Sequence, residues 1–202
     1  MRQPGPPPDS SPELRRFVDL LLRWNRSINL ISRADVADVW TRHVADSLQL
    51  ADHWGDPPPA RGIDLGSGAG FPGLVLAIRF GVAFDVIEQD QAKAAFLREA
   101  ARATGAPAHV IATRIEDAVL PPAPLVTARA LAPLSQLLSY AKPLLLPGGI
   151  CLFSKGRDAE AEIAEASRSW QMNVERIRSR TDKTGVVLRI ADPASSSPTS
   201  AG

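Results

Sequence analysis

A glycine-rich segment constrains the fold of this 202-residue chain more than any other feature of its sequence. Residues 63–73 read IDLGSGAGFPG, so a short apolar run is followed directly by several closely spaced glycines. Glycine lets the backbone turn tightly and lets ligand atoms approach it without a Cβ in the way. A strand that ends in such a loop is typical of open α/β sheets, where the ligand lies outside the carboxyl ends of the strands.

The chain after the glycine loop alternates between strand and helix patterns. Strands are expected at residues 62–65, 84–88, 108–112, 125–128 and 149–154, and helices at residues 74–80, 91–104, 134–145 and 159–170. Residues 174–180 and 186–190 are expected to form a C-terminal β-hairpin. The alternation predicts βαβ units, and hence an α/β fold with a Rossmann-like, mostly parallel sheet of seven strands.

The segment before residue 61 has helical rather than strand patterns. Ser11, Pro12 and Glu13 form a helix start, and apolar residues recur at helical spacing after them. A second amphipathic helix is expected at residues 36–48. We therefore predict a helical region at 11–60 and an α/β domain at 61–191. The proline-rich residues 1–10 and the Ser/Pro/Ala-rich residues 192–202 are expected to be disordered.

Composition excludes several classes of protein. Hydrophobic residues make up 45% of the chain, enough for a core, and the formal net charge of +1 gives no general attraction to nucleic acid. Cys151 is the only cysteine, so neither an internal disulfide nor a cysteine-based zinc site is expected. No signal peptide and no apolar run of membrane-spanning length is apparent. We expect a soluble cytoplasmic protein without a metal site.

The glycine loop is compatible with two kinds of cofactor. Residues 68–73 match G-x-G-x-x-G in a shifted register, which indicates a nicotinamide or flavin dinucleotide. Read from the strand end, Asp-Leu-Gly followed by alternating glycines resembles motif I of class I S-adenosylmethionine methyltransferases. Glu88, at the end of the second strand, is placed to accept both ribose hydroxyls of either cofactor. The loop and Glu88 leave both readings open.

Further segments of the chain favour the methyltransferase. In order they are WNRSINLIS (24–32), RHVADS (42–47), GSGAGFPG (66–73), TRIED (113–117), TARA (127–130) and SKG (154–156). Together they resemble RsmG, the bacterial 16S ribosomal-RNA guanine-N7 methyltransferase family, also called glucose-inhibited division protein B. The resemblance runs from about residue 14 to residue 190. It implies a class I fold, S-adenosyl-L-methionine as cofactor, and 16S rRNA of the small ribosomal subunit as substrate.

The resemblance also implies the residues that bind the cofactor. They are Gly66, Gly68, Phe71, Glu88, Ile115, Glu116 and Arg129. Glu88 is expected to hold the ribose, Ile115 and Glu116 to flank the adenine, and Arg129 to close the site after the fourth strand. Asp64 is expected either to reach the methionine end of the cofactor or to pin the loop.

The chemistry implied by the family needs no protein base, because N7 of guanine has a free lone pair and no hydrogen. His43 therefore has two possible roles. As one residue of an apolar stripe, it is expected to be a core histidine bonded to Asp46, one turn further on. Alternatively, Arg42, His43 and Asp46 pack against the loop and shape the guanine pocket. We predict no catalytic base.

Contact with RNA is expected to depend on local charge. Arg176, Arg178 and Arg180 alternate, which predicts three arginines on one face of a strand, and Lys155 and Arg157 follow the fifth strand. The same arginines are equally compatible with a solvated outer face. In that case the RNA surface would lie on the N-terminal helices, around Arg23, Arg26 and Arg33. A monomer is expected.

Two other functions remain open at this point. The shifted glycine pattern allows an NAD(P)-dependent oxidoreductase. The sequence also allows a ribosome-assembly factor that binds S-adenosylmethionine without turning it over. The predicted function is methylation of N7 of one guanine in 16S rRNA.

Overall fold

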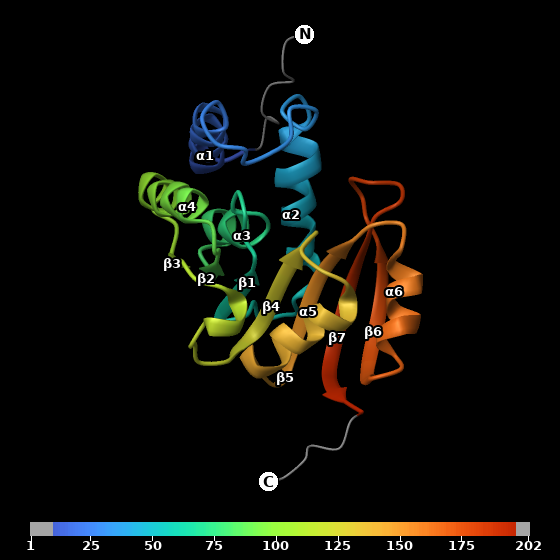
Figure 1. Ribbon diagram of the computed structural model, residues 1–202. Coiled ribbons are helices and arrows are strands. Elements are labelled where there is room, and N and C mark those ends of the chain that lie inside the picture. Colours follow the sequence, from blue (N-terminus) through green and yellow to red (C-terminus); the bar gives the residue numbers. More distant parts are fainter. Residues whose placement is uncertain (1–9, 197–202) are drawn as a thin grey trace.

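The computed structural model describes residues 10–196 and has an α/β architecture around one twisted sheet (Figure 1). In the described part, seven strands pair in the order β3-β2-β1-β4-β5-β7-β6. They are β1 Arg61–Leu65, β2 Ala83–Ile87, β3 Ala108–Ile111, β4 Ala123–Arg129, β5 Leu145–Lys155, β6 Trp170–Arg178 and β7 Val186–Ser195. The first five are mutually parallel, and β7 runs antiparallel to both β5 and β6. The predicted fold class, with its C-terminal hairpin, is confirmed.

Helices cover both faces of the sheet (Figure 1). They are α1 Pro12–Trp24, α2 Asp46–Leu48, α3 Gly73–Phe80, α4 Gln91–Thr104, α5 Leu134–Ala141 and α6 Ala159–Ala166. Apolar residues of α1, α3 and α4 form one core with one face of the strands, and those of α5 and α6 form a second core with the other face. Successive side chains of β5 point to opposite faces of the sheet, so Leu152 lies in the first core and Phe153 in the second.

Several predicted boundaries need correction. The helix expected at 36–48 is a π-helix, η1 (Trp40–Ala45), followed by the short α2 and the 3₁₀ helix η2 (Gln49–His53). The helix expected at 134–145 ends at Ala141 and is followed by the 3₁₀ turn η4 (Lys142–Leu144), which contains a proline that lacks a donor N–H.

The strands of the hairpin are longer than the sequence suggested. β6 starts at Trp170, so the helix expected at 159–170 ends early, at Ala166. The disorder predicted for 192–202 is wrong for residues 192–195, because β7 continues to Ser195, which pairs with Trp170 of β6. The disorder predicted for residues 1–9 and 197–202 concerns positions outside the described residues.

The N-terminal helical region shares its core with the α/β domain. The ring of Phe17 on α1 meets Phe71 of the glycine loop edge-on at 5.6 Å between centroids. It also contacts Phe96 of α4 at 6.2 Å, and Trp24 packs on the same Phe96 ring at 5.8 Å. Residues 11–60 are therefore built into the first core and are not a loosely attached segment.

Removing the Phe17 ring tests this packing. Phe17 is fully buried, so Phe17→Ala should reduce the free energy of unfolding by about 3–5 kcal/mol. Urea denaturation measures the loss. Phe80→Ala is the control, because its ring is 42% exposed, and it should cost clearly less. Equal losses for the two variants would contradict a shared core.

Candidate active site

A large cavity lies at the carboxyl ends of β1, β2 and β4, where an open α/β sheet places its ligand. Its volume is about 1260 Å³. The glycine loop, residues 87–89, 113–116 and 129–132 line one half of it. The second half is lined by the N-terminal segment between Leu30 and Asp46, by residues between Gln136 and Glu162, and by the segment between Ser179 and Val187.

The glycine loop is fixed by backbone conformation and by a buried carboxyl group. Gly66 and Gly68 have φ values of 61° and 55°, in the left-handed region that favours glycine. Asp64 is fully buried and accepts hydrogen bonds from Thr127 Oγ1 at 2.7 Å and from the Gly73 N–H at 3.1 Å. Burial raises the pKa of Asp64 to about 6. Of the two roles expected for Asp64, its contacts fit that of pinning the loop.

Glu88 lies between the loop and the cavity. Its carboxylate accepts hydrogen bonds from the Gly68 N–H and the Asp90 N–H, both at 2.8 Å. It is buried and lines the cavity, and each of its two oxygens accepts only one of these bonds, so both keep acceptor capacity for a ligand. Ile115 and Glu116, in the 3₁₀ helix η3 (Ile115–Asp117), line the same half.

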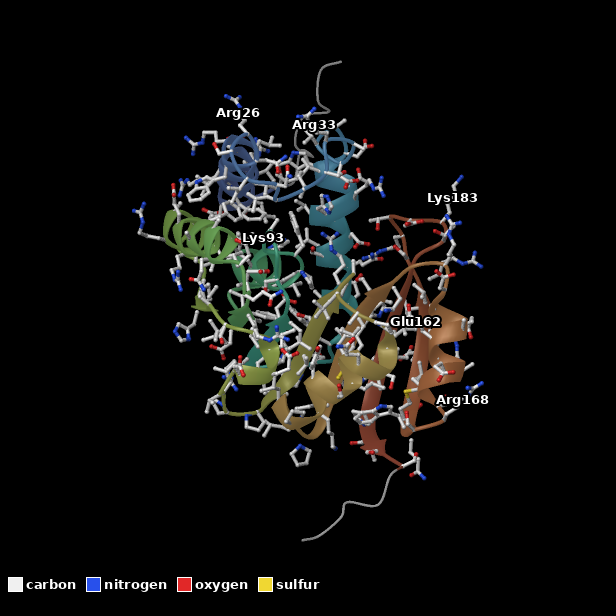
Figure 2. All side chains as sticks on the ribbon, viewed as in Figure 1. Arg26, Arg33, Lys93, Glu162, Arg168 and Lys183 are labelled. Atoms are coloured by element: carbon white, nitrogen blue, oxygen red, sulfur yellow. The ribbon has the colours of Figure 1, made fainter. Side chains whose placement is uncertain are left out.

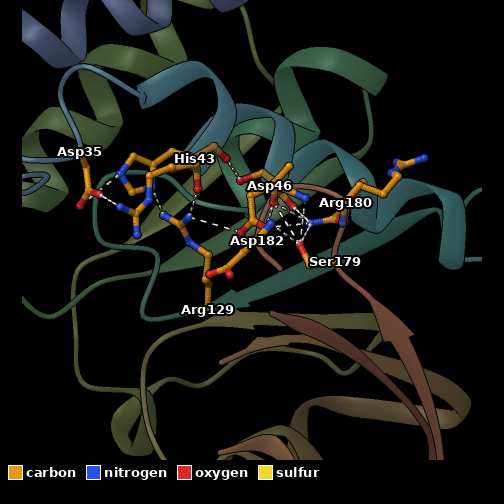
Figure 3. A network of polar contacts seen from close by, with 11 residues as sticks. Asp35, His43, Asp46, Arg129, Ser179, Arg180 and Asp182 are labelled. Carbon is orange, nitrogen blue, oxygen red and sulfur yellow. Dashed lines mark hydrogen bonds and ion pairs between the residues drawn. The ribbon is translucent and has the colours of Figure 1, made fainter. Parts of the chain in front are cut away.

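Arg129 joins the end of β4 to the N-terminal region (Figure 3). Its guanidinium donates to the Arg42 carbonyl oxygen at 3.0 Å and to His43 Nδ1 at 2.8 Å, and it lies 3.5 Å from Asp46 Oδ2. It also sits over the Phe71 ring, 5.0 Å from the centroid. Arg42, His43, Asp46 and Arg129, predicted from separate motifs, are thus brought together on the cavity wall.

His43 is held as a neutral imidazole. Its ring stacks on Phe71 at 4.9 Å, and its Nδ1 must accept the hydrogen bond because Arg129 can only donate. Burial, followed by the charge of Arg129, lowers the pKa of His43 to about 4. The predicted His43–Asp46 bond is wrong. His43 Nε2 lies 3.8 Å from Asp35 Oδ2, whereas the Asp46 carboxylate is directed to Arg129 and to Thr181.

The three arginines predicted to contact RNA, Arg176, Arg178 and Arg180, are not all free cations on one strand face. β6 ends at Arg178, so Arg180 lies beyond the strand. Arg176 pairs with Glu160 at 2.9 Å, and Arg180 pairs with Asp52 at 2.5 Å. Arg178 is exposed and has no ion pair within residues 10–196. Of the three predicted positions, only Arg178 is an unpaired exposed cation.

Lys155 is also unsuited to the phosphate contact predicted for it. Its side chain is only 7% exposed, and Nζ lies 2.5 Å from Glu162 Oε2. Nζ also donates to the Ala132 carbonyl oxygen at 2.9 Å. Lys155 therefore braces the loop after β4 against α6. Arg157, two residues later, is exposed and remains a candidate.

The sequence alone missed the segment between Ser179 and Val187, which closes one side of the cavity. Thr181 Oγ1 donates to Asp46 Oδ1 at 2.6 Å, across a separation of 135 residues. Gln49 accepts from the Arg180 N–H at 3.0 Å. No local pattern signals such pairs, because each partner reads as an ordinary turn or helix residue.

The comparisons with known proteins give a consistent result. A family model described as "rRNA small subunit methyltransferase G" matches residues 10–186. The "Ribosomal RNA small subunit methyltransferase G" of Gluconobacter oxydans is 53% identical over 89% of this chain and 92% of that protein. The protein of the same name from Rhodospirillum centenum is 54% identical over 90% of this chain and 83% of that protein.

The chain belongs to the rRNA small subunit methyltransferase G family. The resemblance drawn from the sequence motifs is confirmed. Among solved structures, the N-methyltransferase NodS of Bradyrhizobium japonicum in complex with S-adenosyl-L-homocysteine aligns with a TM-score of 0.58 at 17% identity. The alignment covers 89% of this chain and 100% of NodS, which supports the class I methyltransferase fold.

None of the helices within residues 10–196 combines the length and apolar character needed to cross a bilayer. In the same residues no group of three or more His, Cys, Asp or Glu side chains is arranged to hold a metal ion. Cys151 is buried in β5, and burial raises the pKa of its thiol to about 12, so the thiolate is disfavoured.

The low pKa of His43 predicts a specific pH dependence of stability. An ordinary histidine has a pKa of 6.5, so unfolding takes up a proton between pH 6.5 and about 4. The free energy of unfolding should therefore fall as pH is lowered through this range. From pH 7 to pH 5, the unsubstituted protein should lose about 2 kcal/mol more than His43→Gln.

Urea denaturation of both proteins at the two pH values measures this difference. The raised pKa of Asp64 acts in the opposite direction, since the folded state there binds the extra proton. That contribution is common to both proteins and cancels in the comparison. Parallel pH profiles for the two proteins would contradict a neutral, buried His43.

Proposed function

We propose that this protein is an S-adenosylmethionine-dependent methyltransferase that methylates N7 of a guanine in 16S rRNA of the small ribosomal subunit. One observation carries the proposal. This chain belongs to the family, and its glycine loop, Glu88 and Arg129 line a single cavity at the switch point of the sheet, where such folds bind their ligands. We expect the protein to act as a monomer in the cytoplasm.

The cofactor is placed in the half of the cavity next to the glycine loop. Glu88 accepts the ribose hydroxyls, while Ile115 and Glu116 flank the adenine. Gly66 and Gly68 lack a Cβ, so the methionine moiety can approach the backbone of the loop closely. Phe71 holds the loop through its contact with Phe17 of α1. Arg129 closes the site at the end of β4. Each of these roles is inferred from the family and from the position of the residue on the cavity.

The reaction requires alignment and no proton transfer. The N7 lone pair forms a bond to the methyl carbon, the carbon–sulfur bond breaks, and its electron pair goes to sulfur. In-line alignment of two reactants can supply ~7–11 kcal/mol of the barrier reduction. A neutral His43 whose Nδ1 already accepts from Arg129 is consistent with this mechanism, because it is not available as a base.

The test uses purified protein, methyl-labelled S-adenosylmethionine and small-subunit rRNA, both as free RNA and as 30S particles. N7-methylguanosine should be the labelled nucleoside. Glu88→Gln should weaken the binding of S-adenosylmethionine roughly 10- to 100-fold, since it removes charged hydrogen bonds to the ribose. Glu165→Gln, which removes an exposed acid outside the cavity, is the control.

The same experiment separates the rival functions. A dinucleotide oxidoreductase would bind NAD(P)H in calorimetric titration and transfer no methyl group. An assembly factor without activity would bind S-adenosylmethionine but leave the RNA unlabelled. The family match and the S-adenosyl-L-homocysteine complex of NodS favour the methyltransferase. Labelling at another base, or none, would contradict the proposal.

The RNA surface is better placed on cations that lack acidic partners. Arg26, Arg33 and Lys183 are exposed and have no ion pair within residues 10–196. Figure 2 shows Arg26 and Arg33 on the N-terminal region and Lys183 at the hairpin loop, all at the same end of the molecule. Arg168, paired with Glu165, is far from them, by the turn before β6. We propose that the RNA backbone spans from Arg26 and Arg33 on the N-terminal region to Lys183 at the hairpin loop, so that its phosphates contact both regions.

A salt series tests this placement. Arg26→Ala with Arg33→Ala, and separately Lys183→Ala, should weaken RNA binding and flatten the logarithmic salt slope by roughly one unit per phosphate contact. The affinity for S-adenosylmethionine should not change. Arg168→Ala is the matched control and should leave the slope as it is. Unchanged slopes in both the Arg26/Arg33 double variant and Lys183→Ala would remove these cations from the RNA surface.

A further inference from the structure

The cavity has room for more than one ligand. A drug-sized ligand typically occupies a pocket of roughly 300–1,000 Å³, whereas this cavity measures about 1260 Å³. The proposed cofactor residues line only the half next to the glycine loop. The second half, between the N-terminal segment and the loop at 179–185, has no ligand assigned to it.

The loop at 179–185 lines this second half, and Figure 3 shows the polar contacts around Asp46 and Ser179 that hold the loop in place. Thr181 Oγ1 donates to Asp46 Oδ1 at 2.6 Å, and the Arg180 N–H donates to Gln49 Oε1 at 3.0 Å. Asp46 is also the ion-pair partner of Arg129. Asp46 therefore holds both the loop and Arg129 at the end of β4. The side chains of the loop are positioned before a ligand binds.

Four carboxylates line the second half, and three of them are neutralised by a cation. Asp35 pairs with Arg42 at 3.2 Å, Asp46 with Arg129 at 3.5 Å, and Glu162 with Lys155 at 2.5 Å. The fourth, Asp182, has no ion pair within residues 10–196. Arg42 acts on Asp182 by its charge without an ion-pair contact, so Asp182 is the acid of this half that no ion pair among the described residues neutralises.

The contacts of Asp182 orient its carboxylate. Oδ1 accepts from the Thr184 N–H at 2.8 Å and from Thr184 Oγ1 at 2.9 Å. The hydrogen bond from the Thr184 backbone, more than any other cause, lowers the pKa of Asp182, so the group is ionised at neutral pH. Both Thr184 bonds go to Oδ1, and the charge of Arg42 and the Gly185 backbone N–H also lower the pKa. Oδ2 is therefore the oxygen of Asp182 with acceptor capacity left for a ligand.

We propose that Asp182 recognises the acceptor guanine by accepting hydrogen bonds from its N1–H and N2–H groups. The assignment rests on the proposed function. Guanine presents two adjacent N–H donors on its Watson–Crick edge. The two lone pairs of Oδ2 can accept both, since Oδ1 already accepts two hydrogen bonds from Thr184. N7 lies on the opposite side of the purine, so a guanine held in this way directs N7 toward the cofactor half of the cavity.

This contact favours the transition state over the bound substrate. As the N7–methyl bond forms and the carbon–sulfur bond breaks, positive charge moves from sulfur to the purine. The Asp182 carboxylate then attracts a developing cation, and the N1–H becomes a stronger donor. An interaction that strengthens during the reaction raises the rate as well as the affinity. Asp182 is thus assigned both a specificity and a catalytic effect.

The test compares two acceptor bases in two proteins. Small-subunit rRNA is prepared with guanine or inosine at the target position, because inosine keeps N7 and N1–H but lacks the 2-amino group. Asp182→Asn should lower kcat/KM on guanine roughly 10- to 100-fold, the range expected for hydrogen bonds to a charged group. The penalty for inosine, present in the unsubstituted protein, should largely disappear in Asp182→Asn.

The controls separate recognition from structure. Binding of S-adenosylmethionine should be the same in Asp182→Asn as in the unsubstituted protein. Glu175→Gln makes the same charge change on an exposed position of β6, and it should keep both full activity and the inosine penalty. An equal inosine penalty in Asp182→Asn and the unsubstituted protein overturns the assignment of Asp182 alone. Absence of methyl transfer by the unsubstituted protein overturns the proposed function as well.

Discussion

The ring of Phe71 is the contact on which the rest of the site depends. It is buried in the turn that ends the glycine loop, and three different parts of the chain pack on it. Phe17 of α1 meets its edge, His43 of η1 stacks on its face, and the Arg129 guanidinium lies over the ring. The loop conformation, the docking of the N-terminal helices and the position of Arg129 are therefore coupled through one aromatic side chain.

Burial of this cluster determines its electrostatics. Arg129 is largely removed from water, and its charge is balanced mainly by Asp46. A second cation beside it would be costly, so the neighbouring His43 is held neutral. The cluster thus contributes one compensated positive charge and a fixed wall to the cavity. Such a site favours a reaction that needs two ligands aligned and no proton removed.

The sequence predicts those features that depend on local patterns. The strand before the glycine loop, Glu88 at the end of β2 and the βαβ alternation all follow from short-range periodicity and turn chemistry. Contacts between side chains that are distant in the sequence cannot be predicted from such local patterns. From the sequence, Lys155 is interpreted as a free cation, whereas in the structure it forms an ion pair with Glu162. Thr181 is interpreted as an ordinary turn residue, whereas its hydroxyl donates a hydrogen bond to Asp46. Likewise Asp192 has the local sequence of a tail, but it lies at an irregularity inside β7, which pairs with β6 on both sides of it, at Ala191 and Ala194.

The central claim is that this cavity aligns its reactants without using a protein base. Single-turnover methyl transfer, measured with saturating S-adenosylmethionine and rRNA between about pH 6 and 9, tests it most directly. A rate that is nearly independent of pH is expected, because His43 stays neutral throughout and guanine N7 carries no proton. A rate that rises with a histidine-like pKa, and loses that rise in His43→Ala, would contradict the account.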